Sequence, residues 1–77
     1  AAEGPWRVQL GAFSVESNAE RLWTRLSGRS ELAGKTRLMV PAGRVTKLQA
    51  GGYATRAEAD TACRALKRAG HECLVTR

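Results

Sequence analysis

The 77-residue sequence has few residues of the kinds that enzymes use for catalysis. It contains one His, no Ser–His or Cys–His set, and no pair of carboxylates at a common catalytic spacing. His71 follows a Gly, which indicates a solvated turn residue, and it has no candidate partners for holding a metal ion. We therefore expect a protein that is not an enzyme, with no catalytic residues, no metal and no cofactor.

The sequence also lacks an apolar run that approaches the roughly 20 residues needed to span a membrane, and it contains no signal peptide. A chain this short supports one domain with a single thin core. We expect residues 1–5 to be a linker and residues 6–77 to be the domain. Any export signal or anchor would then lie upstream in a longer parent protein, and the domain itself would not insert into a membrane.

Acidic residues are in the minority, since 13 Lys and Arg stand against 7 Asp and Glu, for a net charge of +6. A surface of this sign suits polyanions such as nucleic acid, acidic lipid headgroups or an acidic cell wall. The cations do not form a run, so an ordinary basic surface is an equally good interpretation.

What the chain does have is an internal repeat, with the two copies about forty residues apart. Residues 8–14, VQLGAFS, are echoed by residues 48–54, LQAGGYA, and the same ungapped alignment pairs Leu26 with Leu66. Each copy is typical of a strand, a Gly turn with an aromatic residue, and an amphipathic helix. The duplication predicts a small sandwich of one sheet and two helices.

Alternation and turn residues predict strands over residues 6–10, 35–40, 44–50 and 71–76. Gly11 is expected to end the first strand. The first helix is expected to begin at Ser14 or at Ser17, which with Glu20 fits a capping box, and its apolar stripe is Ala19, Leu22, Trp23 and Leu26.

The second helix is expected to begin at Thr55, with Glu58 as its capping-box partner, and to end at Gly70. The resulting order is βαββαβ, a ferredoxin-like (RNP-like) α+β fold with a four-stranded antiparallel sheet. Right-handed crossovers place both helices on one face of the sheet, so the other face is left open.

Polar side chains are expected on that open face. Gln9 and Gln49 offer amide donors and acceptors, Lys47 adds charge, and Val45 and Leu74 add apolar area. We expect Arg37 and Met39 to flank them. Such a mixture suits a sugar with N-acetyl and hydroxyl groups, although composition alone favours an ordinary solvated sheet face.

The two Cys are candidates for a disulfide. Cys63 lies on the apolar stripe of the second helix, and the parity of Cys73 after Gly70 points it toward that helix. We favour a disulfide, and with it an oxidising compartment, over the alternative of two reduced and buried Cys.

These patterns together resemble the SPOR (sporulation-related repeat) family of bacterial cell-envelope proteins. The resemblance covers residues 6–77. It rests on residues 7–14, 18–22, 26, 48–51, 57–59, 66 and 69–75.

The resemblance implies binding to glycan strands of peptidoglycan, preferentially those that have lost their stem peptides. It also implies that the domain directs a larger periplasmic protein to the division septum. The candidate glycan-binding residues are Gln9, Gly11, Ala12, Val45, Lys47, Gln49 and Leu74.

The resemblance makes Gln9 the key contact. Ala12 takes a position where a Ser is common in relatives, and Val45 and Lys47 take positions of an aromatic residue and a cation in some relatives. Leu74 is the apolar contact of the last strand.

Two other functions fit the predicted fold. An RRM-like domain that binds single-stranded RNA shares the βαββαβ order, but it stacks bases on aromatic residues of the first and third strands. Residues 44–50 contain no aromatic residue, so we expect no nucleic-acid partner. A protein-interaction or dimerisation module is the third interpretation, whereas the glycan-binding interpretation predicts a monomer.

Overall fold

The computed structural model describes residues 4–77. Its elements in chain order are β1 (Trp6–Phe13), α1 (Glu16–Leu26), the 3₁₀ helix η1 (Ser30–Leu32), β2 (Thr36–Ala42), β3 (Val45–Tyr53), α2 (Arg56–Arg68) and β4 (Leu74–Thr76). The expected linker at residues 1–5 falls partly on residues 1–3, which lie outside the described residues. Apart from η1, which the sequence analysis missed, the order is the predicted βαββαβ.

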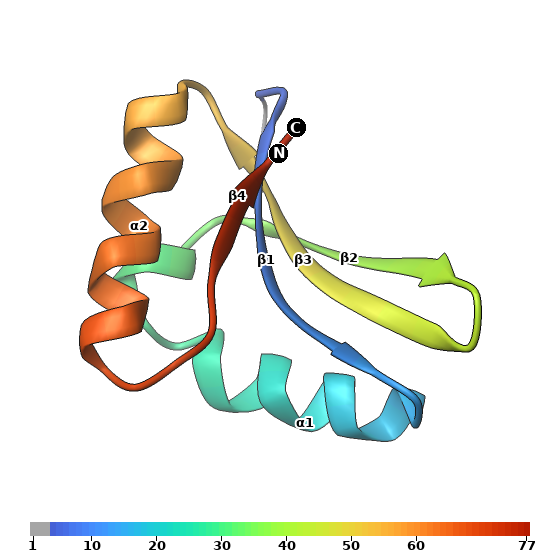
Figure 1. Cartoon of the computed structure of the whole chain (residues 1–77). Coiled ribbons are helices and arrows are strands. Elements are labelled where there is room, and N and C mark those ends of the chain that lie inside the picture. Colours follow the sequence, from blue (N-terminus) through green and yellow to red (C-terminus); the bar gives the residue numbers. More distant parts are fainter. Residues whose placement is uncertain (1–3) are drawn as a thin grey trace.

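The four strands form one antiparallel sheet in the order β2-β3-β1-β4. The two copies of the repeat pair with each other at its centre, because β1 adjoins β3 and Gln9 lies opposite Gln49. In Figure 1, α2 lies to the left of the sheet and α1 below it, and no helix of residues 4–77 lies on the upper right side. The predicted α+β fold class is therefore confirmed.

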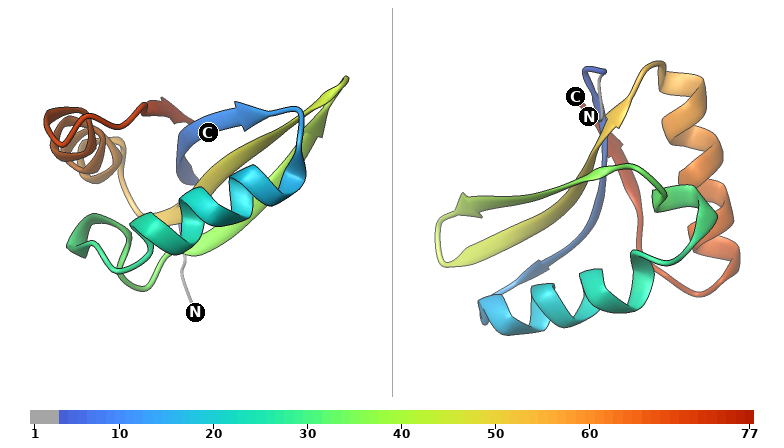
Figure 2. Two further views of the ribbon diagram at one scale, coloured as in Figure 1. Left: turned by 90° about the horizontal axis from the view of Figure 1, so that it is seen from below. Right: turned by 180° about the vertical axis from the view of Figure 1, so that it is seen from behind.

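The sheet is strongly bent and twisted (Figures 1 and 2). β1 descends beside α2 and then turns away above α1, so the face without helices is on the inside of the bend. A register shift between Gln9 and Gly11 marks a β-bulge in this strand. An extra residue on one strand bends it and increases its twist, which explains why β1 curves.

The core lies between the sheet and the two helices, and the predicted apolar stripes of both helices face it. Leu26 of α1 and its repeat equivalent Leu66 of α2 are at most 1% exposed, and Leu22 and Trp23 pack against the same cluster. The other large side chains that are fully buried are Val8, Leu10, Leu32 and Leu48.

The two helices differ in how they begin. α2 starts as predicted, because the hydroxyl of Thr55 accepts from the backbone N–H of Glu58, and the Glu58 carboxylate accepts from the N–H of Ala54. The predicted start of α1 is wrong: its N-cap is Val15, which provides no side-chain cap, and Ser17 lies inside the helix. β1 continues to Phe13, so only Ser14 and Val15 separate strand from helix, and the helix starts before Ser17.

The C-terminal end of α2 is also as predicted. Gly70 has φ +88°, and the N–H of His71 donates to the carbonyl of Leu66 while that of Gly70 donates to Lys67. These bonds satisfy carbonyl groups that the helix end would leave without partners, and the backbone conformation favours glycine.

Several predicted strand boundaries are wrong. β2 continues to Ala42 rather than ending at residue 40, and β3 continues to Tyr53 rather than ending at residue 50. β1 does not end at Gly11, because the bulge lets pairing with β3 continue to Phe13, opposite Thr46. The last strand begins at Leu74 rather than at residue 71, because residues 71–73 return the chain from α2 to the sheet.

The predicted orientation of β2 is wrong as well. Leu38 pairs with Gln49 and therefore lies on the open face, whereas Met39 pairs with Leu48 and packs against the core. Arg37 pairs with Ala50, on the helix side, and is exposed at the edge. Apolar residues occupy both faces of this strand, so alternation does not decide its orientation, and only pairing with β3 does.

Candidate functional site

One row of side chains crosses the open face along the backbone pairing. Leu74 of β4 is opposite Gln9, Gln9 is opposite Gln49, and Gln49 is opposite Leu38 of β2. Residues directly opposite one another in an antiparallel sheet share a face. The predicted site residues Gln9, Gln49 and Leu74 are therefore brought together, and Leu38 joins them. The sequence analysis missed Leu38 because it assigned β2 the wrong orientation.

The bulge of β1 adds a second row. After the register shift, Ala12 is opposite Lys47, and Lys47 is opposite Val40. Regular alternation would place Ala12 on the face opposite to Gln9, but the additional residue returns it to the open face. The predicted site residue Gly11 is not on the open face: it is buried opposite the core residue Leu48, and a Cβ built on it would lie 3.0 Å from the Phe13 ring.

A chain of hydrogen bonds joins the polar members of the first row. Nη1 of Arg7 donates to Oε1 of Gln49 at 3.2 Å, and Nε2 of Gln49 donates to Oε1 of Gln9 at 3.4 Å. Gln49 is only 6% exposed, and its amide is engaged at both ends. Within residues 4–77, no protein group accepts from Nε2 of Gln9, so this half-buried amide retains its donors for a ligand.

The sheet carries cations and no carboxylate. None of the four strands contains Asp or Glu, whereas Arg7 and Lys47 lie on the open face. Lys47 and Val45 are half-buried, and Leu74 is 59% exposed. The face thus offers one free amide, positive charge and an exposed apolar edge to a hydroxyl-rich or anionic ligand.

All four aromatic side chains lie away from this face. Trp6, Phe13 and Trp23 pack against the core, and Tyr53 is part of it. The guanidinium of Arg77 also lies 5.3 Å from the Trp6 ring centroid. Since an RRM-type site stacks bases on exposed strand aromatics, the open face lacks the groups that such recognition uses.

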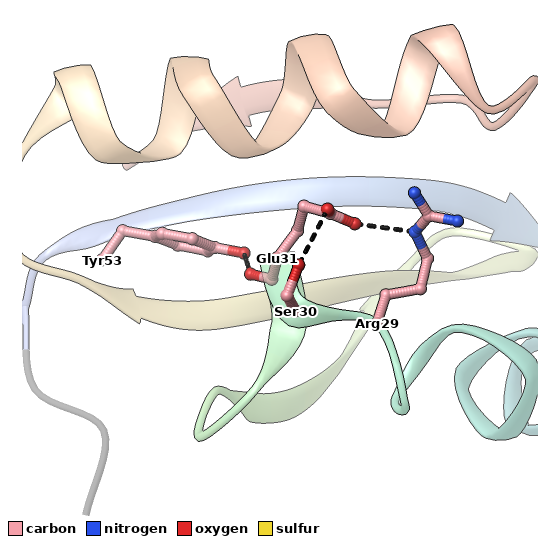
Figure 3. A network of polar contacts seen from close by, with 4 residues as sticks. All are labelled: Arg29, Ser30, Glu31 and Tyr53. Atoms are coloured by element: carbon pink, nitrogen blue, oxygen red, sulfur yellow. Dashed lines mark hydrogen bonds and ion pairs between the residues drawn. The ribbon is translucent and has the colours of Figure 1, made fainter.

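One hollow lies on the other side of the molecule, away from the open face. It has a volume of about 680 Å³, and it lies between η1 and α2, where Glu31, Lys35 and Tyr53 line it. The Tyr53 hydroxyl donates to the Glu31 carbonyl at 2.9 Å, and the Glu31 carboxylate pairs with Arg29 at 2.6 Å (Figure 3). The contacts with Glu31 tie η1 to the end of β3 and to Arg29, so we interpret the network as structural.

Two pKa values in this network are shifted. The hydrogen bond from Arg29 lowers the pKa of the Glu31 carboxyl group. Burial raises the pKa of Tyr53 to about 12, and the nearby Glu31 charge adds to the rise. The ammonium group of Lys35 lies 4.7 Å from the Tyr53 ring centroid. Because η1 was not predicted, no signal in the sequence indicated this cluster.

The predicted disulfide is present. Cys63 of α2 and Cys73 are bonded, with their Cα atoms 5.3 Å apart. The bond fixes the chain immediately before β4, and β4 supplies Leu74 to the open face. It therefore ties one edge of the candidate site to the helix layer.

Neither a metal centre nor a membrane span is found in the described part of the chain. No group of three or more His, Cys, Asp and Glu side chains in residues 4–77 could hold a metal ion. In the same residues, no helix is long and apolar enough to cross a membrane.

Known proteins share this architecture. Among solved structures, the chain is similar to the peptidoglycan binding domain of the B. subtilis cell wall lytic enzyme CwlC, at 28% identity and a TM-score of 0.73, over 99% of this chain and 91% of that one. It is also similar to the RlpA SPOR domain from Pseudomonas aeruginosa, at 19% identity and a TM-score of 0.72, over 95% of this chain and 99% of that one. Comparison with curated proteins gives no match.

The likeness to RlpA supports the fold alone, because sequence identity is low. The SPOR domain model, however, matches residues 2–77, which is almost the whole chain. The chain belongs to the SPOR domain family.

Proposed function

We propose that this domain binds glycan strands of peptidoglycan through its open sheet face, without catalysis. The observation that carries the proposal is the likeness, along nearly the whole chain, to the peptidoglycan binding domain of CwlC. Membership of the SPOR domain family supports it. The domain acts as a monomer that directs a larger parent protein to peptidoglycan.

The proposed contacts follow the two rows of the open face. The Gln9 amide donates to hydroxyl or N-acetyl oxygens, while Gln49, held by Arg7, fixes the orientation of Gln9. Leu74 contributes exposed apolar area beside them. Ala12 and Val45 contribute shape but neither a hydroxyl group nor a stacking ring. Each neutral hydrogen bond contributes about 0.5–1.5 kcal/mol net, so affinity arises from several sugars together.

The cellular setting is the further part of the proposal. We place the domain in the bacterial periplasm, where the Cys63–Cys73 disulfide is stable, and at the division septum, where glycan strands lose their stem peptides. A binding experiment tests the preference for stripped strands. Imaging of a fluorescent fusion of the domain tests the septal location.

The test is a pull-down with purified sacculi, before and after treatment with an amidase that removes stem peptides. We expect more protein on the treated sacculi, and about a two- to tenfold weaker interaction for Gln9→Ala, which removes one or two hydrogen bonds. Asn18→Ala is the matched control, because it removes an exposed amide of α1 on the helix side.

Absence of binding to treated sacculi would contradict the proposed function. If Gln9→Ala and Asn18→Ala weakened binding to sacculi equally, the proposal that the site lies on the open face would be contradicted. An RNA gel shift that persists at physiological salt would support the RRM-like alternative instead, since binding through scattered cations fades as salt rises.

A further inference from the structure

A second hollow lies at the β4 edge of the sheet, between this strand and α2. It is a groove of about 360 Å³, lined by Cys63 of α2 and by Leu74 and Val75 of β4. Leu74 is also the last residue of the first row of side chains on the open face, where it lies opposite Gln9. The groove is therefore continuous with the proposed glycan site, because one exposed side chain belongs to both.

The helix side of this groove is cationic. Arg56, Asp60, Arg64 and Lys67 line it, and Asp60 is the only carboxylate among the lining residues. Nε of Arg56 lies 3.8 Å from Oδ2 of Asp60, so these two charges offset each other. Within residues 4–77, Arg64 and Lys67 make no ion pair, and both are exposed. The groove therefore has two positive charges without an ion-pair partner among the described residues.

Among residues 4–77, Asp60 is the only acidic residue that lines the groove. Glu72 precedes Cys73 in sequence, but its Oε2 is 3.6 Å from the place that a Cβ of Gly11 would occupy, near Phe13. It thus lies beside β1 and is not among the residues that line the groove. β4 itself carries no charged residue.

The proposed ligand acquires the matching charge by simple chemistry. Hydrolysis of the amide that joins a stem peptide to the sugar leaves a carboxylate on the sugar. Such a carboxyl group is ionised at neutral pH. A glycan with its peptides attached has a neutral amide at the same place. A cationic groove beside the site therefore distinguishes the two forms by charge.

We propose that Arg64 and Lys67 form a carboxylate subsite at the β4 edge, which binds the free sugar carboxylate of a stripped glycan strand as the strand passes over Leu74. The inference rests on the proposed function. It assigns the preference for stripped strands to charge recognition at the β4 edge, outside the two rows of side chains on the open face. Exposed ion pairs are individually weak, so the effect depends on salt.

The experiment compares two soluble probes. One is stripped glycan with free carboxylates, and the other is the same glycan with its carboxylates coupled to methylamine, which makes neutral amides. At low salt, the wild-type domain should bind the charged probe on the order of three- to tenfold more tightly, as two exposed ion pairs allow. The double variant Arg64→Gln with Lys67→Gln should bind both probes equally, with the affinity that the wild type has for the neutral probe.

Two further variants complete the comparison. Arg21→Gln with Arg25→Gln removes the same charge from exposed positions of α1, far along the chain from β4, and should keep the wild-type preference. Arg64→Lys with Lys67→Arg keeps the charge of the groove and should keep the preference as well.

The outcomes separate the two proposals. If the wild type binds neither probe, the proposed function itself fails. If it binds both probes equally, glycan binding stands and the carboxylate subsite is overturned. If the α1 variant loses as much preference as the groove variant, net charge explains the effect, and the subsite is again overturned.

Discussion

The first half of the chain, built on β1 and α1, and the second half, built on β3 and α2, fold the same repeated sequence with different means. α2 has a side-chain cap at Thr55, a glycine end at Gly70 and a disulfide to the segment before β4. α1 has none of these, and its start follows closely on a strand. Local signals fix the second half, whereas the first half depends more on its packing.

The two Gln at equivalent positions of the repeat, Gln9 and Gln49, also differ between the halves. Gln49 is buried, and both ends of its amide are occupied, while Gln9 is half-buried and keeps its donors. Their positions in the repeat are equivalent, but Gln9 lies beside Leu74 of β4, whereas Gln49 lies beside Leu38 of β2 and accepts from Arg7. The two copies therefore differ in structure: the Gln49 amide is fully engaged, and only the Gln9 amide keeps donors for the proposed ligand.

The largest expected effect on stability comes from the core, and it tests whether both halves of the chain pack equally tightly against it. Leu26→Ala and Leu66→Ala each remove a fully buried side chain, so each should lower the free energy of unfolding by about 2–5 kcal/mol. Urea denaturation measures both, and Arg21→Ala on the exposed face of α1 is the control. A small loss for Leu26→Ala alone would mean that the first half packs loosely.

The disulfide, which lies in the second half of the chain, gives the next largest effect on the unfolding free energy. Its cysteines are separated by 10 positions, for which the chain-entropy estimate is about 2–3 kcal/mol. Replacing Cys63 and Cys73 together by Ala should lower the unfolding free energy by that amount relative to the oxidised protein. Coincident urea transitions with and without reductant for the wild type would contradict this.

Phe13 and Tyr53 are equivalent positions of the repeat, but only Tyr53 has a hydroxyl group, bonded to the Glu31 carbonyl. Tyr53→Phe should cost about 1 kcal/mol at neutral pH. Burial raises the pKa of Tyr53 from 10.0 to about 12 in the folded protein. The unfolded chain therefore loses this proton first as pH rises, and stability should fall between pH 10 and about 12.

The titration of this group can be followed directly, because the chain has a single Tyr. Tyrosinate absorbance should appear near the raised pKa in the folded protein. Tyr53→Phe should remove the corresponding part of the alkaline loss of stability. An alkaline stability curve unchanged by this substitution would argue against a buried phenol.

The helix caps give the smallest effect and the sharpest contrast. Thr55→Ala should destabilise by about 1 kcal/mol, because it removes the hydrogen bond to the Glu58 N–H. Val15→Asp should stabilise by up to about 1 kcal/mol, since it supplies a cap where none exists. Thermal unfolding measures both, and a gain from Val15→Asp that fails to appear would mean that the strand–helix connection prevents capping.

The two predicted capping boxes illustrate how far the sequence alone leads. Thr55 with Glu58 and Ser17 with Glu20 are the same pattern, yet only the first caps a helix. The pattern is local, but the place where α1 begins depends on how far β1 pairs with β3. Pairing is a contact between distant residues, so a local pattern does not encode it.

Some residues of the candidate site were likewise predictable from local patterns, and others were not. The open face, with Gln9, Gln49 and Leu74 on it, was predicted from alternation and repeat, and the pairing brings these residues together. The place of Leu38 was not predictable, because both faces of β2 are apolar. Nor was the groove beside β4, which requires the distance between a helix and a strand to be known.

The order of elements, the buried stripes of the two helices and the disulfide partners followed from the sequence alone. Hydrophobic periodicity and turn residues carry that information locally. Only the tertiary structure decided that a bulge returns Ala12 to the face of Gln9, that Met39 is buried instead of Leu38, and that cations of α2 border the proposed glycan site. Strand register and helix position depend on packing between distant segments, and one misplaced residue reverses every side chain that follows.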